Sequence, residues 1–181
     1  MKSLLKALCI FMVPWFMTGC GSKNVPHLPT VAAVDPAKYQ GQWFEIARYE
    51  NRFEKGCVGA TAEYTLENKT ILVTNRCYDE SGTEINEAKG KAFVVDGSNG
   101  SRLRVSFFWP FYGDYWILML PDNYRYSVVG TPDRKYLWIL SRTKHLSAAD
   151  RDKILNNLPQ LGFAPERLYW TRFKSQAANE T

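Results

Sequence analysis

Alternation of apolar and polar residues is the main pattern of the chain over residues 41–142. It is clearest over residues 102–107, where Leu103, Val105 and Phe107 face one way and two arginines and a serine face the other. Successive side chains of a strand point to opposite sides of the sheet, so alternation of this kind is typical of a strand with one buried face. The pattern therefore predicts a β-rich domain.

Short turn signals divide this region into segments rich in Val, Ile, Thr and aromatic residues. Eight strands are predicted, over residues 43–50, 59–67, 70–78, 85–95, 102–108, 114–120, 124–131 and 136–142. Connections of hairpin length make neighbouring strands pair antiparallel. Strands of this kind pack as two sheets or close into a barrel, and only closure removes the exposed sheet edges.

One helix is predicted after the strands. Ser147 is a suitable N-cap, with Asp150 three residues later in the manner of a capping box. An apolar stripe follows at helical spacing, made of Ile154, Leu155, Leu158 and Leu161. Gly162 is expected to end the helix, whose stripe would pack on the strands. Residues 167–173 are predicted to form a last strand.

The N-terminus has the pattern of an export signal. Two lysines precede an apolar run over residues 7–17, which is shorter than the roughly 20 residues that span a bilayer. The run ends at Thr18-Gly19-Cys20 and resembles the signal of bacterial lipoproteins. That resemblance implies removal of residues 1–19 and attachment of acyl chains, palmitate among them, to Cys20. The alternative is an ordinary signal peptide that ends on a cysteine by chance.

The same resemblance implies where in the cell the protein is located. Gly21 follows the cysteine, in place of the aspartate that retains such proteins in the inner membrane, so we expect an outer-membrane lipoprotein that faces the periplasm. Several acyl chains make such an anchor stable. Residues 21–29 are polar and contain two prolines, and residues 20–33 are interpreted as a lipidated tether.

Two cysteines remain for the exported domain, Cys57 and Cys77. They flank the predicted turn at residues 67–69 almost symmetrically, and an oxidising compartment preserves disulfides. We expect them to form a disulfide. The alternatives are two free thiols or a reactive Cys57.

Charge and motifs exclude several classes of function. The formal net charge is +5, and the basic residues are scattered among acidic ones, so no nucleic-acid partner is expected. The two histidines, His27 and His145, have no spacing suited to a metal pair. No Gly-x-Ser-x-Gly motif and no phosphate loop is present, and the sequence therefore predicts no enzyme, no metal and no cofactor.

Several segments together resemble the lipocalin family, and within it the bacterial outer-membrane lipoproteins. Residues 39–48 (YQGQWFEIAR) are similar to the first family motif, and residues 128–133 (VVGTPD) and 136–142 (YLWILSR) to later ones. Residues 105–115 are similar to the bacterial branch. The second motif departs at residues 120–124 (LPDNY), which leaves the geometry of that loop open.

The resemblance implies an all-β fold. An eight-stranded antiparallel up-and-down barrel, closed at one end and open at the other, would occupy residues 34–174, with the helix alongside and a flexible tail over residues 175–181. Gly41 opens the motif, Trp43 would plug the closed end, and Arg142 would lie across its indole. This set is expected to be structural.

Inward-facing aromatic side chains would line the barrel, since 14% of the chain is aromatic. The candidates for the pocket wall are Phe93, Phe107, Trp116, Tyr126 and Trp138. Such a lining suits a fatty acid or a lysophospholipid, held for lipid storage or transport. Residues 109–112 (WPFY) would guard the mouth, contact a membrane or a partner, or simply pack as a loop.

Two other functions stay open at this point. One is a lipocalin-fold enzyme acting on a lipid, and the other is an envelope interaction protein with a filled barrel. The sequence also leaves open a homodimer.

Overall fold

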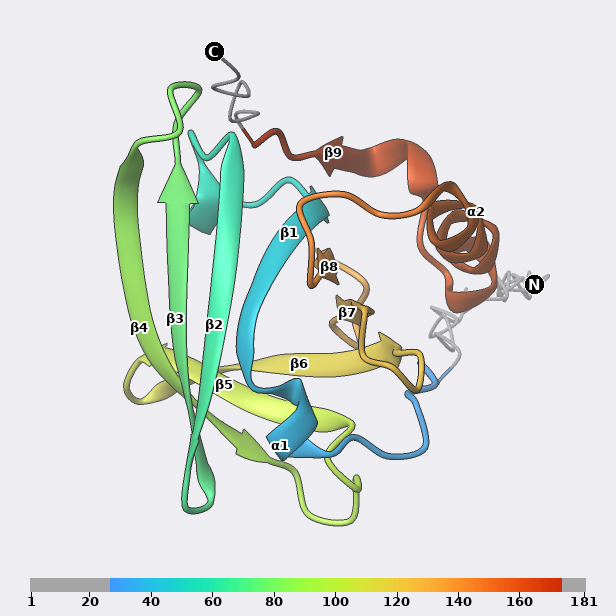
Figure 1. The fold of residues 1–181 in the computed structure, drawn as a ribbon. Coiled ribbons are helices and arrows are strands. Elements are labelled where there is room, and N and C mark those ends of the chain that lie inside the picture. Colours follow the sequence, from blue (N-terminus) through green and yellow to red (C-terminus); the bar gives the residue numbers. More distant parts are fainter. Residues whose placement is uncertain (1–26, 174–181) are drawn as a thin grey trace, which may run out of the picture.

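The strands close into an antiparallel barrel (Figure 1), as predicted. The computed structural model describes residues 27–173, so Cys20, the signal and the tail lie outside the described residues. The barrel strands are β1 (Gly41–Tyr49), β2 (Gly59–Glu67), β3 (Thr70–Tyr78), β4 (Glu84–Val94), β5 (Arg102–Phe108), β6 (Phe111–Met119), β7 (Tyr126–Gly130) and β8 (Leu137–Ser141). Each pairs with the next, and β1 closes the ring by pairing with both β2 and β8.

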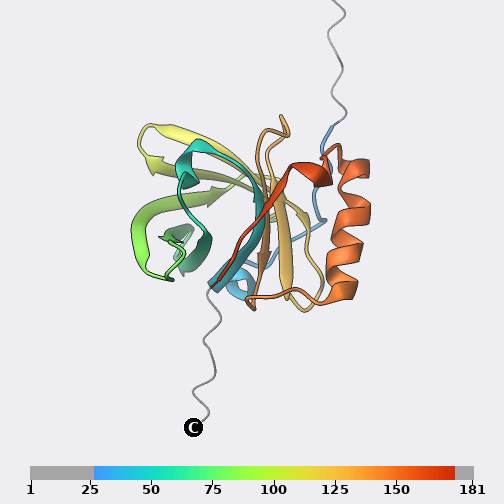
Figure 2. The ribbon, with the colours of Figure 1, turned by 90° about the horizontal axis from the view of Figure 1, so that it is seen from above.

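The barrel is splayed between β1 and β2. Only residues 41–44 of β1 pair with β2, whereas residues 47–49 pair with β9 (Leu168–Trp170), the predicted last strand. The register between β1 and β8 shifts between Glu45 and Ala47, which marks a bulge. The two strands therefore diverge toward the end opposite α1 (Pro36–Tyr39), and Figure 2 shows the barrel from that end.

Short helices frame the barrel. The predicted helix is α2 (Ala148–Asn157), and the Ser147 hydroxyl accepts from the Asp150 N–H, as expected of its N-cap. The 3₁₀ helix η2 (Pro159–Leu161) follows, and Gly162 ends it with φ 81°. The small elements α1, η1 (Arg52–Glu54) and η3 (Pro165–Arg167) were not predicted, because one turn leaves no periodic signal.

Buried apolar side chains form two clusters. The outer cluster joins the barrel to α2 and is built from Leu28, Ile46, Ala47, Tyr49, Leu118, Tyr126, Val128, Leu137, Ile139, Ile154, Leu158, Phe163 and Leu168. The interior cluster fills the closed half of the barrel and is built from Val34, Tyr39, Trp43, Ala62, Tyr64, Ile71, Val73, Ala92, Leu103, Ile117, Val129 and Leu140. Residues 27–173 contain no helix long and apolar enough to cross a membrane.

The expected tether is shorter than residues 20–33. Leu28 is only 2% exposed and belongs to the outer cluster, and the Val31 N–H donates to the Ile117 carbonyl at 3.0 Å. The Thr30 and Ser101 hydroxyls share a hydrogen bond of 3.0 Å. Residues 28–33 are therefore part of the fold. The tether prediction was wrong there. Leu28 and Val31 pack on the fold, but their mostly polar neighbours in the sequence give no periodic pattern that would have indicated it.

Candidate functional site

The closed end of the barrel is sealed by Trp43 and Arg142, as the resemblance implied. Trp43 is fully buried, and its indole N–H donates to the Tyr39 carbonyl at 2.9 Å. The Arg142 guanidinium lies 3.7 Å from the indole centroid. Gly41 precedes them with φ 87°, a conformation that favours glycine. Trp43 and Arg142 therefore close this end of the barrel.

The strand register shows which side chains point into the barrel. Ala92 and Leu103 are buried in the interior cluster, so the positions two residues away on the same strands also face inward. Many of these inward positions on β2, β4 and β6 carry small residues, namely Ala60, Ala62, Ala88, Gly90, Ala92 and Gly113. Small side chains on facing walls leave volume in the barrel.

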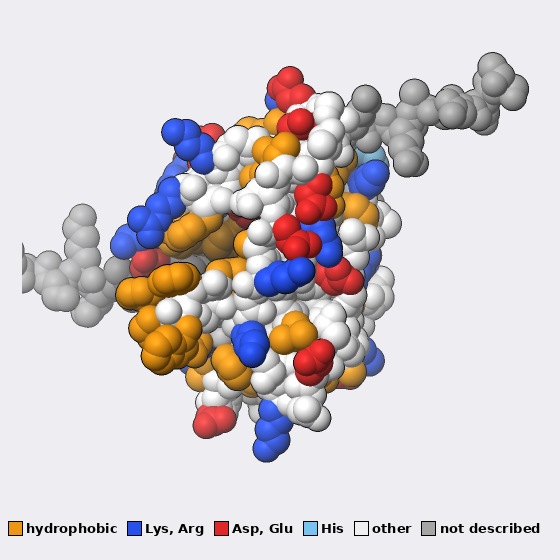
Figure 3. Space-filling view, turned by 90° about the vertical axis from the view of Figure 1, so that its left-hand side faces the viewer, with side chains coloured by type: hydrophobic (Ala, Val, Ile, Leu, Met, Phe, Trp, Pro, Cys, Tyr) orange, Lys and Arg blue, Asp and Glu red, His pale blue; other side chains and the backbone are white. Residues whose placement is uncertain are grey.

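The barrel interior is open to solvent in the half that lies away from Trp43 and α1, here called the open half. Ala88 and Gly90 are half-buried and Gly113 is exposed, although all three face inward. Figure 3, which faces the left-hand side of Figure 1, shows a recess in the surface next to a group of exposed hydrophobic side chains. The barrel is therefore a cup, sealed below by Trp43 and accessible above.

Two of the five predicted pocket residues lie inside the cup. Trp138 packs against the interior cluster, and its ring stacks on Tyr136 with centroids 5.8 Å apart. Phe107 lies beside Gly90 on the inner face, since a Cβ on Gly90 would come 2.8 Å from the Phe107 ring. Phe107 is 46% exposed, so it borders the opening. That these side chains bind a ligand stays a prediction.

The other three predicted pocket residues point outward, so their assignment to the wall was wrong. Phe93 follows the inward Ala92, and its neighbour across the ladder is Arg104. Trp116 lies opposite Arg102, whose guanidinium is 5.4 Å from its ring. Tyr126 is buried in the outer cluster beneath α2. Alternation misleads at Tyr126 because β7 is buried on both faces. Phe93 lies on β4, which is exposed over most of its length, and Trp116 packs against the outer cluster, so an aromatic side chain at these positions does not mark the inner face.

A tyrosine cluster lies in the closed half of the cup. The Tyr115 hydroxyl shares hydrogen bonds of 2.9 Å with those of Tyr39 and Tyr64, and Tyr39 also donates to the Ser127 hydroxyl at 2.8 Å. Burial raises the pKa of Tyr39 to about 12, and it raises the pKa of Tyr64 and Tyr115 as well. The three phenols are therefore neutral, and they offer a polar floor to a mostly apolar cup.

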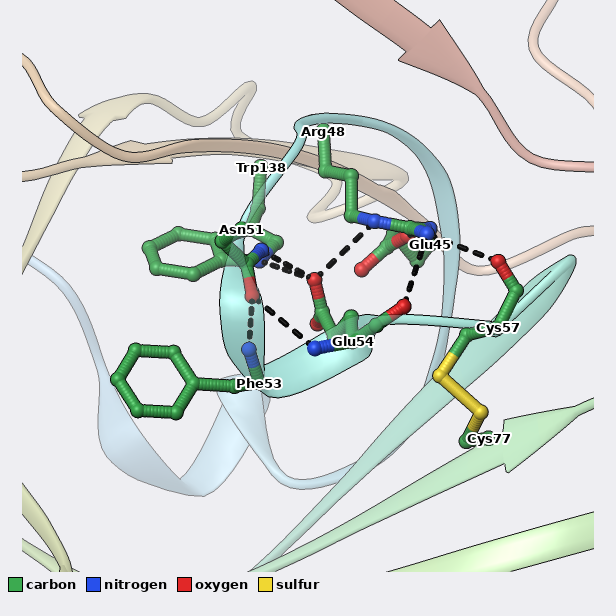
Figure 4. The surroundings of a disulfide bond; sticks show 8 residues. All are labelled: Glu45, Arg48, Asn51, Phe53, Glu54, Cys57, Cys77 and Trp138. Atoms are coloured by element: carbon green, nitrogen blue, oxygen red, sulfur yellow. Dashed lines mark hydrogen bonds and ion pairs between the residues drawn. A yellow bond between two sulfur atoms is a disulfide. The ribbon is translucent and has the colours of Figure 1, made fainter.

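Charged residues are buried in the open half, a feature that sequence reasoning missed (Figure 4). Arg48 Nη1 lies 2.7 Å from Glu45 Oε1, and Arg48 Nε lies 3.2 Å from Glu54 Oε2. Burial and the nearby Glu54 carboxylate raise the pKa of Glu45 from 4.5 to about 8, against the opposing effect of Arg48. The available signal was two charged residues on an otherwise apolar strand.

This charged cluster fastens the loop between β1 and β2. Arg48 Nη2 donates to the Cys57 carbonyl at 2.8 Å, and the Trp138 indole N–H donates to Glu54 Oε2 at 3.4 Å. The predicted disulfide joins the same loop to β3, with the Cα atoms of Cys57 and Cys77 5.2 Å apart. The loop is therefore tied to β1, β3 and β8 at the open end of the cup (Figure 4).

One buried polar atom on the cup wall has no partner in the part of the chain that the structure describes. The Asn75 side-chain oxygen accepts no hydrogen bond there. Asn75 faces inward, and Ala62 and Ala88 are its neighbours across the two ladders. An unpaired buried acceptor costs free energy, so a hydroxyl or amide of a bound molecule would be favoured at this point.

Residues 27–173 contain no group of three or more His, Cys, Asp or Glu side chains placed to hold a metal ion. The polar groups of the cup are phenols, amides and one charged cluster tied to the loop. Such groups can bind and orient a molecule. No nucleophile paired with a base stands among the residues named for the cup.

Comparison with known proteins gives consistent results. Residues 34–173 match the family profile described as Lipocalin-like domain. The outer membrane lipoprotein Blc of Vibrio cholerae is 37% identical over 93% of this chain and 99% of its own length. The outer membrane lipoprotein Blc of Escherichia coli K12 is 35% identical over 93% and 97%. These relatives confirm the predicted outer-membrane localisation.

Solved structures support the fold. Insecticyanin from the tobacco hornworm Manduca sexta superposes with a TM-score of 0.68 at 22% identity, over 84% of this chain and 87% of that one. Apolipoprotein D of Macaca fascicularis is a more distant sequence relative, 35% identical over 72% of each chain. The sequence match, the closed barrel and its sealed end agree, and the chain belongs to the lipocalin family.

Proposed function

We propose that this protein holds a single-chain lipid, a fatty acid or a lysophospholipid, for storage or transport at the outer membrane. Lipocalins bind small hydrophobic molecules, and the open cup suits an acyl chain. The observation that carries the proposal is the inner wall of small residues around Ala88 and Gly90, which is accessible to solvent above and sealed by Trp43 below.

The acyl chain would lie against Trp138, Val105 and the small residues of β2 and β4. Burial of each methylene contributes about 0.8 kcal/mol, so the cup gains affinity from chain length. The Asn75 oxygen is unpaired and would accept a hydrogen bond from a hydroxyl of the ligand. A polar head group would remain at the opening, where Asn86 faces inward and is exposed.

The membrane anchor is part of the same proposal. Residues 1–19 are removed, Cys20 carries acyl chains, and the free tether ends before Leu28, which is buried. The domain then spans residues 28–173. Retention of a Cys20→Ser variant by the membrane would contradict the anchor. The protein binds its lipid and releases it unchanged.

Native mass spectrometry of the mature protein, extracted with its co-purifying lipids, tests the proposal. The expected result is a bound fatty acid or lysophospholipid that leaves as the intact molecule. Turnover of that lipid would instead support an enzyme. If no lipid co-purifies and laurate, myristate, palmitate and stearate all fail to bind, an interaction protein with a filled barrel replaces this account.

A further inference from the structure

The tip of the β5–β6 hairpin is the most exposed apolar surface among residues 27–173. Phe108, Trp109 and Phe111 are 74%, 78% and 70% exposed. Residues 105–113 carry no charge at all. Contiguous exposed aromatic surface marks a site of contact with another apolar body, because leaving it in water costs free energy.

The hairpin tip is a fixed feature of the fold. Phe108 and Phe111 pair across the ladder, and their rings stack with centroids 6.3 Å apart. Behind the tip, the Phe93 and Tyr112 rings lie 6.4 Å apart on the outer face of the sheet. Because the side chains are already ordered in pairs, contact with a partner would cost little further conformational entropy.

The same apolar surface continues into the cup. Phe107 precedes the tip and borders the opening beside Gly90. Figure 3 shows hydrophobic side chains gathered at the edge of the molecule, next to the recess. A body that contacts the tip is therefore placed beside the entrance.

The length of the chain between Cys20 and the described domain indicates what the hairpin tip contacts. The described chain begins at His27, whose ring lies 6.0 Å from that of Trp116 on β6. Along β6, Trp116 and Phe111 are about 17 Å apart at 3.3 Å per residue. The chain from Cys20 to His27 spans at most about 25 Å. An anchor at Cys20 would therefore keep a bilayer within reach of the tip at all times.

We infer that the hairpin tip, Phe108 to Phe111, inserts into the interface of the membrane that anchors the protein, and holds the mouth of the cup against it. This inference rests on the proposed function for the Cys20 anchor and the lipid ligand. Tryptophan and tyrosine favour the membrane interface, since their rings combine an apolar body with a polar edge. The ligand then passes between bilayer and cup without crossing bulk water.

Depth-dependent quenching tests the insertion. The mature lipidated protein is reconstituted into phosphatidylethanolamine–phosphatidylglycerol vesicles whose acyl chains carry bromine, which quenches nearby indoles. We expect strong quenching that Trp109→Phe abolishes. The matched control is Trp170→Phe, which removes an indole on the α2 side of the barrel, and it should leave the quenching intact. Equal quenching before and after Trp109→Phe would overturn the inference.

Aqueous iodide separates a second alternative. If Trp109 is shielded from both iodide and the brominated lipids, a second copy of the chain or another protein covers the tip. That outcome also overturns the inference. Protection from iodide together with quenching by bromine supports it.

Lipid transfer tests the functional consequence. Vesicles loaded with anthroyloxy-stearate are mixed with protein-bearing vesicles, and transfer into the cup is followed by fluorescence. Trp109→Ser combined with Phe111→Ser should slow the transfer about tenfold, the factor equivalent to about 1.4 kcal/mol. Ile85→Ser, another exposed apolar position on β4, is the control and should have no effect. Unchanged transfer in the double variant would contradict the inference.

Failure of this inference is distinguishable from failure of the proposed function. The double variant should bind dissolved anthroyloxy-stearate in detergent as tightly as the parent protein does. If neither protein binds it, the proposed function fails, whatever the quenching shows. Because both substituted side chains are exposed, the thermal midpoint of the double variant should match that of the parent, which checks its fold.

Discussion

Arg142 and Trp43 form the seal of the barrel: the guanidinium lies 3.7 Å from the indole centroid and also donates to two backbone carbonyls. Those carbonyls belong to Lys38, next to the C-terminal end of α1, and to Gln42, near the start of β1. One side chain thus joins β8, α1 and β1. The planar guanidinium stacks on the Trp43 indole while its N–H groups donate to both carbonyls, and a lysine ammonium cannot do both, so lysine is no substitute for Arg142.

The first prediction concerns this seal. Arg142→Lys should lower the free energy of unfolding by about 1–3 kcal/mol, since it loses the stacking and two hydrogen bonds. Arg151→Lys is the matched control, because Arg151 lies 4.3 Å over Trp170 on the exposed face and should cost under about 1 kcal/mol. Urea unfolding measures both. Equal losses in the two variants would contradict a special role for Arg142.

The second prediction concerns the disulfide. Cys57→Ser combined with Cys77→Ser should destabilise the protein by about 3 kcal/mol, because the bond closes a segment with a sequence separation of 20. The parent protein should show the same loss under reducing conditions, and the double variant should be insensitive to reductant. If the unfolding midpoint of the parent protein is the same with and without reductant, the structural role of the disulfide is contradicted.

The strands were predictable from their Val, Ile, Thr and aromatic residues and from the turn signals between them. Three strands, β2, β3 and β5, have the bounds that alternation predicts. The expected loop over residues 109–112 is confirmed for residues 109 and 110, which form the turn, and was wrong for residues 111 and 112, because Phe111 pairs with Phe108 and β6 starts there. Four large residues in a row carry no alternation, so the sequence could not place the turn, which falls at Trp109 and a cis Pro110.

The candidate site was less predictable, for two physical reasons. Where α2 covers β7 and β8, both faces of the strands are apolar, and the inward face has no distinct pattern; Tyr126 was misassigned for this reason. The charged cluster depends on contacts across the loop, since Arg48 meets Glu54 only after the chain turns back. Pairing of this kind is set by tertiary structure.

The third prediction concerns pH. The pKa of Glu45 is raised from 4.5 to about 8, so the folded state binds a proton more tightly than the unfolded state does. The contribution of Glu45 is therefore fully present below pH 4.5 and is lost as pH rises toward about 8. The slope from this one group is at most about 1.4 kcal/mol per pH unit.

Glu45→Gln should remove that slope, because glutamine stays neutral throughout the range. Urea unfolding of parent and variant at pH values between 5 and 8 gives the comparison. Identical pH dependence in the two proteins would show that Glu45 is ionised throughout the range.

The fourth prediction tests where the ligand lies. Ala88→Trp places an indole in the cup, and palmitate affinity should fall at least about tenfold, since the added side chain occupies the space of several buried methylenes. Lys91→Trp puts the same side chain on the outer face of the same strand and should leave affinity unchanged. If both variants bind palmitate equally well, the ligand does not occupy the cup.

The central claim is that an acyl chain fills the barrel, and affinity as a function of chain length tests it most directly. Calorimetric titration of the mature protein with laurate, myristate, palmitate and stearate should show affinity rising about fourfold per methylene until the cup is full. Trp138→Ala should weaken every member of the series, because Trp138 lines the interior. If the affinity does not change with chain length and Trp138→Ala binds each fatty acid as tightly as the parent protein does, the account is contradicted.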